Sequence, residues 1–200
     1  AQIAQVALWL TDHQMNMRIS EEFGRYFRRL PLKKSPGIVC GNALRLDWES
    51  VVKPAELSYI LGNPPFVGHH LQTPQQKKEM LATYGEDAHS AGVMDYVSAW
   101  YCMATKYIQN TNIKVSFVST NSITQGEQVG ILWRSLTKKY KIFIHFAHRT
   151  FKWSSEARGK AAVYCVIIGF GASNVERKRL FEYEKPDGQP MEAAANNINA

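Results

Sequence analysis

Leu61-Gly62-Asn63-Pro64-Pro65-Phe66 is the stretch that says most about the fold of this chain. It follows an apolar run at residues 57–60, so the pattern predicts a buried strand that opens into a rigid loop. Each proline fixes its own φ angle and removes one backbone N–H donor. An Asn side chain, carbonyl oxygens and an aromatic ring remain at the carboxyl edge of a sheet, where open α/β sheets bind ligands. These groups suit a flat substrate that carries an amino group.

Strands and helices alternate on both sides of this loop. Helical spacing of apolar residues predicts helices over 2–17, over 93–109 and around 131–136, and a further helix is expected near 74–84 within the long polar segment 68–92. Apolar runs predict strands at 38–40, 57–62, 113–118, 142–148 and 161–169. This alternation favours an α/β fold with an open, mostly parallel sheet. From residue 176 the pattern fades, and residues 176–200 are predicted to be a linker or the start of another domain.

Composition sets further bounds on the class of protein. Two hundred residues suffice for one domain, and no apolar run approaches the ~20 residues that span a bilayer, so no membrane partner is expected. The net charge of +7 favours a polyanion such as nucleic acid, although ordinary surface charge explains it equally well. Cys40, Cys102 and Cys165 lie in apolar segments and are interpreted as reduced core cysteines of a cytosolic protein.

A few polar residues near the loop allow two interpretations each. His69 and His70, with His89, match no common ligand spacing, so solvated loop histidines are favoured over a metal site. Asp95 could orient the loop from the next helix, but a plain helix cap is the favoured interpretation. Ser122 or Thr124 is a candidate cap for the helix around 131–136.

Residues 63–66 resemble the Asn/Asp-Pro-Pro-Tyr/Phe signature (motif IV) of S-adenosylmethionine-dependent amino-methyltransferases at all four positions. Gly41-Asn42-Ala43-Leu44 resembles the strand end that contacts the cofactor's adenine ring (motif III), where the family more often has Asp in place of Asn42. Residues 145–153 resemble the later motifs (VII and VIII), in which an aromatic residue stacks on the target base. Residues 151–157 and 161–170 prompt a closer resemblance, to the methylase part of MmeI-like fused type II restriction–modification enzymes.

The resemblance implies a fold and an activity. The fold is α/β: a Rossmann-like methyltransferase sheet with helices on both faces, lacking its first strands. The order of motifs is that of the γ class, whose members methylate the exocyclic amino group of adenine in DNA with S-adenosyl-L-methionine and no metal. The implied partners are double-stranded DNA and the missing domains of a parent chain, and the implied location is a bacterial-type cytoplasm.

Roles carry over from the resemblance residue by residue. The catalytic residues would be Asn63, Pro64, Pro65 and Phe66, with the Asn63 side-chain oxygen and the Pro64 carbonyl as acceptors for the amino group. Asn42, Ala43 and Asn63 would bind the cofactor, and Phe66 and Phe151 would stack on the target base.

One departure from the family concerns the glycine-rich turn that holds the methionine end of the cofactor, which is not found in residues 1–40. We therefore expect residues 1–175 to be a partial catalytic domain containing motifs III to VIII, and the isolated fragment to be inactive. Two alternatives stay open. The substrate could be a glutamine amide or an RNA base, or the chain could be a nucleic-acid-binding piece without catalysis.

Overall fold

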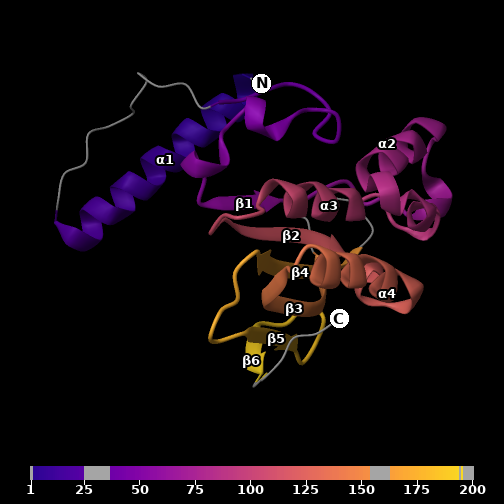
Figure 1. The fold of residues 1–200 in the computed structure, drawn as a ribbon. Helices are drawn as coiled ribbons and strands as arrows, with labels where there is room; N and C mark the ends of the chain where they lie inside the picture. The colour runs from indigo at the N-terminus through magenta and orange to yellow at the C-terminus, as the bar shows by residue number, and fades with distance from the viewer. Residues whose placement is uncertain (1, 25–36, 154–162, 194, 196–200) are drawn as a thin grey trace. The chain divides into compact units, whose positions relative to one another are not determined.

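The computed structural model describes residues 2–24, 37–153, 163–193 and 195. The chain divides into two compact units, Ala1–Lys53 and Pro54–Ala200, and each is described here by itself. Figure 1 traces the elements along the chain. Among the described residues, no helix is long and apolar enough to cross a membrane.

The first unit is built around the helix α1 (Gln2–Phe23). The helix expected over 2–17 is confirmed and runs six residues further. The expectation that one apolar face packs is wrong, because α1 has no buried residue and Ile3 is 88% exposed. The connector expected at 18–34 is helical up to Phe23, and its residues 25–34 lie outside the described residues.

The strand expected at 38–40 is not formed. Residues 37–40 are irregular, and none of the described strands pairs with them, so their backbone lacks the hydrogen-bonded neighbour that a strand needs. Cys40 is exposed, which corrects its expected place in the core, whereas Cys102 and Cys165 are buried, and all three are free thiols. The unit also holds a turn at 42–46 and a short 3-10 helix, Trp48–Ser50, capped by Asp47.

The second unit contains the sheet. Its helices are α2 (Pro74–Tyr84), α3 (Ser98–Tyr107) and α4 (Gly126–Arg134), which continues as a π turn, Ser135–Lys139. Short 3-10 helices lie at Pro54–Glu56, His69–Leu71, Gly85–Val93 and Asn121–Thr124. Its strands are β1 (Tyr59–Gly62), β2 (Lys114–Thr120), β3 (Phe143–Trp153), β4 (Val163–Gly171), β5 (Arg179–Tyr183) and β6 (Pro190–Ala193).

The six strands form one mixed sheet in the order β1-β2-β4-β3-β5-β6, and Figure 1 shows them side by side. β1 pairs with β2 and β3 with β5 in parallel, whereas β4 is antiparallel to both of its neighbours and β6 to β5. The expectation of a mostly parallel sheet is therefore corrected. The sequence also predicts a linker from residue 176 onwards, but β5 and β6 lie in that stretch and extend the sheet.

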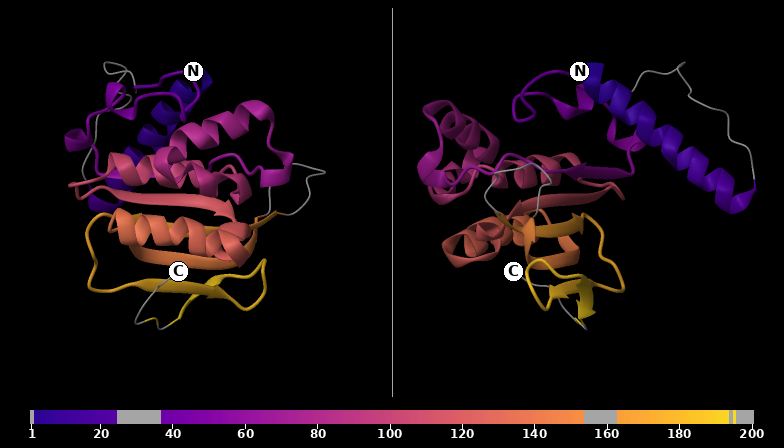
Figure 2. Two further views of the ribbon diagram at one scale, coloured as in Figure 1. Left: turned by 45° about the vertical axis from the view of Figure 1, so that its right-hand side comes forward. Right: turned by 180° about the vertical axis from the view of Figure 1, so that it is seen from behind.

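The core of this unit lies between the sheet and the helices α3 and α4. The Tyr101 ring on α3 has its centroid 5.2 Å from that of Phe117 on β2, 5.7 Å from that of Trp133 on α4 and 5.5 Å from that of Phe170 on β4. These contacts place both helices on one face of the sheet, as the further views in Figure 2 also show. On the opposite face Leu61 of β1 is 77% exposed.

The helix ends show where local patterns mislead. The helix α3 begins at Ser98 rather than at residue 93, and the residues before it are extended or turn. Neither Ser122 nor Thr124 caps α4: its N-cap is Gln125, without a side-chain hydrogen bond. The helix α2 confirms its predicted range and begins with a capping box between Thr73 and Gln76.

Candidate active site

The loop of residues 63–66 begins directly after β1, as the sequence predicts. Asn63 and Pro65 are exposed, Pro64 is buried and Phe66 is half-buried. In the described part of the chain, no other residue hydrogen-bonds to the Asn63 side chain and no other ring stacks on Phe66. The acceptor oxygen of Asn63 and the ring of Phe66 are thus open to a ligand.

The strand that precedes the loop packs closely on its neighbour. A Cβ atom at Gly62 would lie 3.2 Å from the ring of Phe117 on β2, closer than most Cβ contacts. Glycine therefore lets the start of the loop approach the sheet without displacing that ring.

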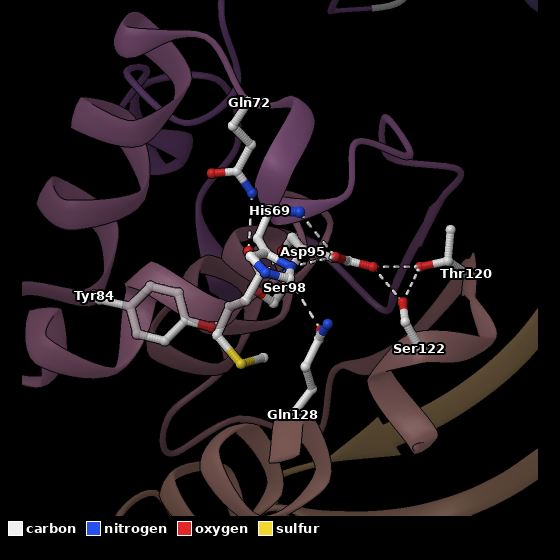
Figure 3. Close-up of polar contacts among 9 residues, drawn as sticks. His69, Gln72, Tyr84, Asp95, Ser98, Thr120, Ser122 and Gln128 are labelled. Atoms are coloured by element: carbon white, nitrogen blue, oxygen red, sulfur yellow. Dashed lines mark hydrogen bonds and ion pairs between the residues drawn. The ribbon is translucent and has the colours of Figure 1, made fainter. Parts of the chain in front are cut away.

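Asp95 lies between this loop and the end of β2, as Figure 3 shows. Its Oδ1 accepts a hydrogen bond of 3.1 Å from the backbone N–H of His69. Its Oδ2 accepts hydrogen bonds from the hydroxyls of Ser122 and Thr120, the latter at 3.3 Å. Only 6% of Asp95 is exposed. A buried carboxylate needs such partners, and here its two oxygens join two separate segments of the chain.

The backbone of Asp95 is held as firmly as its side chain. Its N–H donates to Oε1 of Gln128 on α4 at 3.2 Å, and its carbonyl accepts the Ser98 hydroxyl at 2.6 Å. Ser98 in turn accepts from the hydroxyl of Tyr84 at 2.8 Å. Burial raises the pKa of Tyr84 well above its ordinary value, so this hydroxyl stays protonated and remains a donor. Asp95 is not the cap of α3, which corrects the favoured interpretation and supports the alternative.

The strand register brings further residues to the same edge of the sheet. β1 and β2 are parallel, so Asn63 and the exit of β2 at Thr120 lie at one edge. Thr120 is opposite Cys165 of β4, which is opposite Phe151 of β3. Phe151 therefore lies at this edge too, three strand spacings or about 14 Å from β1.

Phe151 already has an aromatic neighbour. Its ring stacks on Tyr183 of β5 with a centroid distance of 5.2 Å, and Trp153, which is 41% exposed, lies 6.0 Å away. The structure therefore does not bring Phe151 next to Phe66, and its role in base stacking stays a prediction. Residues 154–162, part of the segment behind the closer resemblance, lie outside the described residues.

Asn42 and Ala43, the predicted cofactor contacts, belong to the first unit. The Asn42 Oδ1 accepts the Leu44 N–H at 2.9 Å, and the Ala43 carbonyl accepts the indole N–H of Trp48 at 2.9 Å. These two hydrogen bonds stabilise the local turn. The amide N–H groups of Asn42 remain available as donors to a ligand. The cofactor role of both residues stays a prediction.

Of the histidines near the loop, His69 has a structural contact. The His69 backbone is tied to Asp95, and its Nδ1 lies 4.0 Å from the Asp95 Oδ1, so the simple description of a solvated histidine is incomplete. In the described ranges, no group of three or more His, Cys, Asp or Glu residues is arranged to hold a metal ion.

Comparison with known proteins supplies the family. Residues 1–182 match the family described as the MmeI DNA-methyltransferase domain. The chain belongs to this family. As an MmeI-type domain it is 56% identical to the solved structure of the type IIL restriction–modification enzyme MmeI in complex with DNA, with a TM-score of 0.88. That match covers 98% of this chain and 26% of the MmeI chain.

A curated relative agrees with this assignment. DNA methyltransferase A of Bacillus subtilis (strain 168) is 44% identical over 183 residues, which are 90% of this chain and 21% of that protein. The MmeI-type domain described here thus spans about a fifth to a quarter of these two relatives. The similarity to MmeI also confirms the expected Rossmann-like methyltransferase fold.

The sequence indicated only part of this site. It placed residues 63–66 correctly, because the prolines define that loop locally. It did not connect Thr120 and Ser122 with Asp95, from which Ser122 is separated by 27 residues. The run of small polar side chains after a buried strand is the sequence feature that could have indicated this contact.

Proposed function

We propose that this domain transfers a methyl group from S-adenosyl-L-methionine to the exocyclic amino group of adenine in double-stranded DNA. The observation that carries the proposal is the exposed Asn63 side chain at the carboxyl edge of the sheet, with no hydrogen-bond partner among the described residues. It stands beside a proline carbonyl and an available ring. Membership of the MmeI DNA-methyltransferase domain family supports the class of reaction.

Asn63 and Pro64 would act as acceptors. The lone pair of the adenine amino group is delocalised into its ring, which makes the nitrogen a poor nucleophile. Two hydrogen bonds, from the amino group to the Asn63 side-chain oxygen and to the Pro64 carbonyl, localise that lone pair and orient it. Positioning and fixed dipoles then provide the catalysis, with no covalent intermediate on the protein.

The cofactor would supply an electrophilic methyl group on a sulfonium. Asn42, Ala43 and Asn63 are the residues of this chain that would hold it, and the Asn42 amide still has N–H donors to offer. Residues 1–40 contain only Gly24 and Gly37, so the glycine-rich turn for the methionine end is not supplied there.

If DNA is the substrate, as proposed, the target base has to reach this edge of the sheet. The target adenine would leave the duplex at a cost of a few kcal/mol, part of which stacking on Phe66 would recover. The chain's net charge of +7 suits a polyanion. Since the chain spans only about a quarter of MmeI, we place the choice of DNA sequence in segments outside these 200 residues.

The test is the pair Asn63→Ala and Asn63→Asp in the full-length protein that carries this chain. Transfer of radiolabelled methyl to duplex DNA should fall about 100- to 1000-fold in Asn63→Ala. Asn63→Asp keeps an acceptor oxygen and should retain part of the activity. Calorimetry should show DNA affinity largely intact in both variants.

Substrate competition separates the alternatives. Single-stranded RNA and a glutamine-containing peptide should accept no label under conditions in which duplex DNA does. Unimpaired DNA methylation in Asn63→Ala would refute the assigned role.

A further inference from the structure

We propose that Asp95 is a positioning residue for methyl transfer, acting through the Asn63–Phe66 loop. Its carboxylate ties the segment that follows Phe66 to the end of β2, so that the acceptor oxygens of the loop keep a fixed place at the sheet edge. This inference rests on the proposed function for its kinetic consequences, but its structural consequence is measurable without any methyl transfer.

The segment that follows the loop is attached to the residues around Asp95. Three hydrogen bonds join residues 67–72 to residues 94–96. The Tyr96 N–H donates to the Val67 carbonyl at 2.9 Å, and the Gln72 amide donates to the Met94 carbonyl at 2.9 Å. The third is the His69 N–H to the Asp95 Oδ1 at 3.1 Å. The third bond uses the Asp95 side chain, so a substitution of Asp95 removes it and leaves the other two in place.

The hydrogen-bond donors and acceptors around the Asp95 Oδ2 also have to match. Oxygen atoms of Thr120 and Ser122 lie within hydrogen-bond distance of it and 2.8 Å from each other. An ionised carboxylate has no proton to give, and the two hydroxyls have one each. The Ser122 hydroxyl donates to Asp95, and Thr120 donates either to Asp95 or to Ser122. In the wild-type cluster both carboxylate oxygens of Asp95 therefore accept hydrogen bonds.

The cluster is anchored on the sheet and on a helix. Thr120 is the last residue of β2, Ser122 lies in the 3-10 helix that follows, and Gln128 on α4 accepts the Asp95 N–H. These partners come from elements that the core holds in place, whereas the segment after the loop is held by the Asp95 bond and two further hydrogen bonds. Loss of the carboxylate would leave His69 without its acceptor and free the loop to move.

The test uses Asp95→Ala and Asp95→Asn in the full-length protein, with Asp87→Ala as the matched control. Asp87 is also a carboxylate that accepts from a serine hydroxyl, Ser135, but it pairs with Lys139 far along the chain from the loop. Asp95→Ala should lower kcat for DNA methylation about 10- to 100-fold, because a displacement of about 1 Å at the reacting groups has that effect. Its affinity for S-adenosylmethionine should stay within about twofold of wild type.

The conservative variant distinguishes positioning from mere stability. In Asp95→Asn the side-chain oxygen can still accept from His69, while its amide donates to Ser122 and Ser122 donates to Thr120. Its kcat should stay within about fivefold of wild type, since the geometry persists and only charge assistance is lost. A loss in Asp95→Asn equal to that in Asp95→Ala would overturn the inference.

Hydrogen exchange followed by mass spectrometry gives the second readout. Amides of residues 67–72 should exchange about tenfold faster in Asp95→Ala and at the wild-type rate in Asp87→Ala. Unchanged exchange and unchanged kcat in Asp95→Ala would refute the inference. If the wild-type protein fails to methylate DNA, the proposed function is refuted. The amide exchange rates of residues 67–72 would still test whether Asp95 holds the loop. Should Asp95→Ala not fold, Ser122→Ala replaces it, and unchanged kcat and exchange there would be the refuting result.

Discussion

At the scale of single residues, the four members of the loop differ sharply although they are adjacent. Pro64 is buried, Asn63 and Pro65 are exposed and Phe66 is half-buried. Because proline fixes φ, the direction of the chain here depends on the loop's own sequence more than on distant contacts. This is why the sequence alone could predict an exposed acceptor at Asn63.

Phe66 allows a test of stacking at this scale. Phe66→Leu should lower kcat/KM for duplex DNA about 5- to 100-fold, because it replaces a flat ring whose stacking on a base is worth about 1–3 kcal/mol. Phe66→Tyr keeps the ring and should stay close to wild type. Steady-state methylation kinetics measure both values, and equal kcat/KM for the Leu variant and wild type would contradict a stacking role.

Asp95 shows what residue-scale reasoning misses. A carboxylate a few residues before a helix is usually read as its cap. Its actual partners, His69 and Ser122, are 26 and 27 residues away along the chain. No local pattern encodes such distances, so the sequence could place the loop but not the contacts that hold it.

At the scale of elements, periodicity predicted those with clear apolar patterns. The strand at 57–62 and the helix at 74–84 agree closely with β1 and α2. Predictions failed where a tertiary partner decided the outcome. The helix α4 begins at Gly126 with Gln125 as its N-cap, so Ser122 and Thr124 both lie before the capping position.

The direction of β4 is another such failure. Alternating strands and helices indicate parallel pairing, but no described helix separates β3 from β4, and the two strands pair antiparallel. The apolar run of β4 shows that it is buried without showing which way it points.

Two glycines test how tightly this sheet is packed. A Cβ at Gly169 of β4 would lie 2.1 Å from the Phe146 ring opposite it on β3, whereas one at Gly130 of α4 would meet nothing within 4 Å. Gly169→Ala should therefore lower the free energy of unfolding by about 1–3 kcal/mol, since the ring has to move. Gly130→Ala should raise it by about 0.5–1 kcal/mol through helix propensity.

Denaturation by urea measures both changes in the same chain. The opposite signs make Gly130→Ala the control for the added methyl group itself. Equal stability of Gly169→Ala and wild type would show that the β3–β4 contact is looser than the structure indicates.

At the scale of the whole molecule, the candidate site consists of residues that the sheet gathers from separate stretches. The register brings the exits of β1 and β2 and residue Phe151 to one edge, and Asp95 links two of these segments. Motif order along the sequence singled out the Asn63–Phe66 loop and Phe151 as candidate site residues. Their pairing could not be predicted, because it depends on the antiparallel insertion of β4 between β2 and β3.

Two histidines couple the stability of the sheet to pH. His145 is buried and its Nε2–H donates to the Ser173 carbonyl at 2.8 Å, and His148 bonds to the Tyr183 hydroxyl through Nδ1 at 2.8 Å. Burial lowers the pKa of His145, and nearby lysines lower it further, against the opposing effect of the Ser173 hydrogen bond. Burial and then Arg179 lower the pKa of His148. Both rings therefore stay neutral in the folded chain at pH values where an unfolded histidine is protonated.

The sign of the resulting effect follows from proton binding. Unfolded histidine titrates near pH 6.5, so below that pH the unfolded state binds more protons than the folded state and stability falls. The thermal midpoint followed by circular dichroism should be constant above about pH 7 and decline from about pH 6.5 down through the lowered pKa values. The double variant His145→Gln with His148→Asn keeps both hydrogen-bonding positions and removes both titrations, so its decline between pH 6.5 and 5 should be shallower. Comparing the thermal midpoints at pH 7.5 corrects for any packing lost in the variant. If the midpoint of the variant falls with pH as steeply as that of wild type, groups other than these two histidines control the acid response.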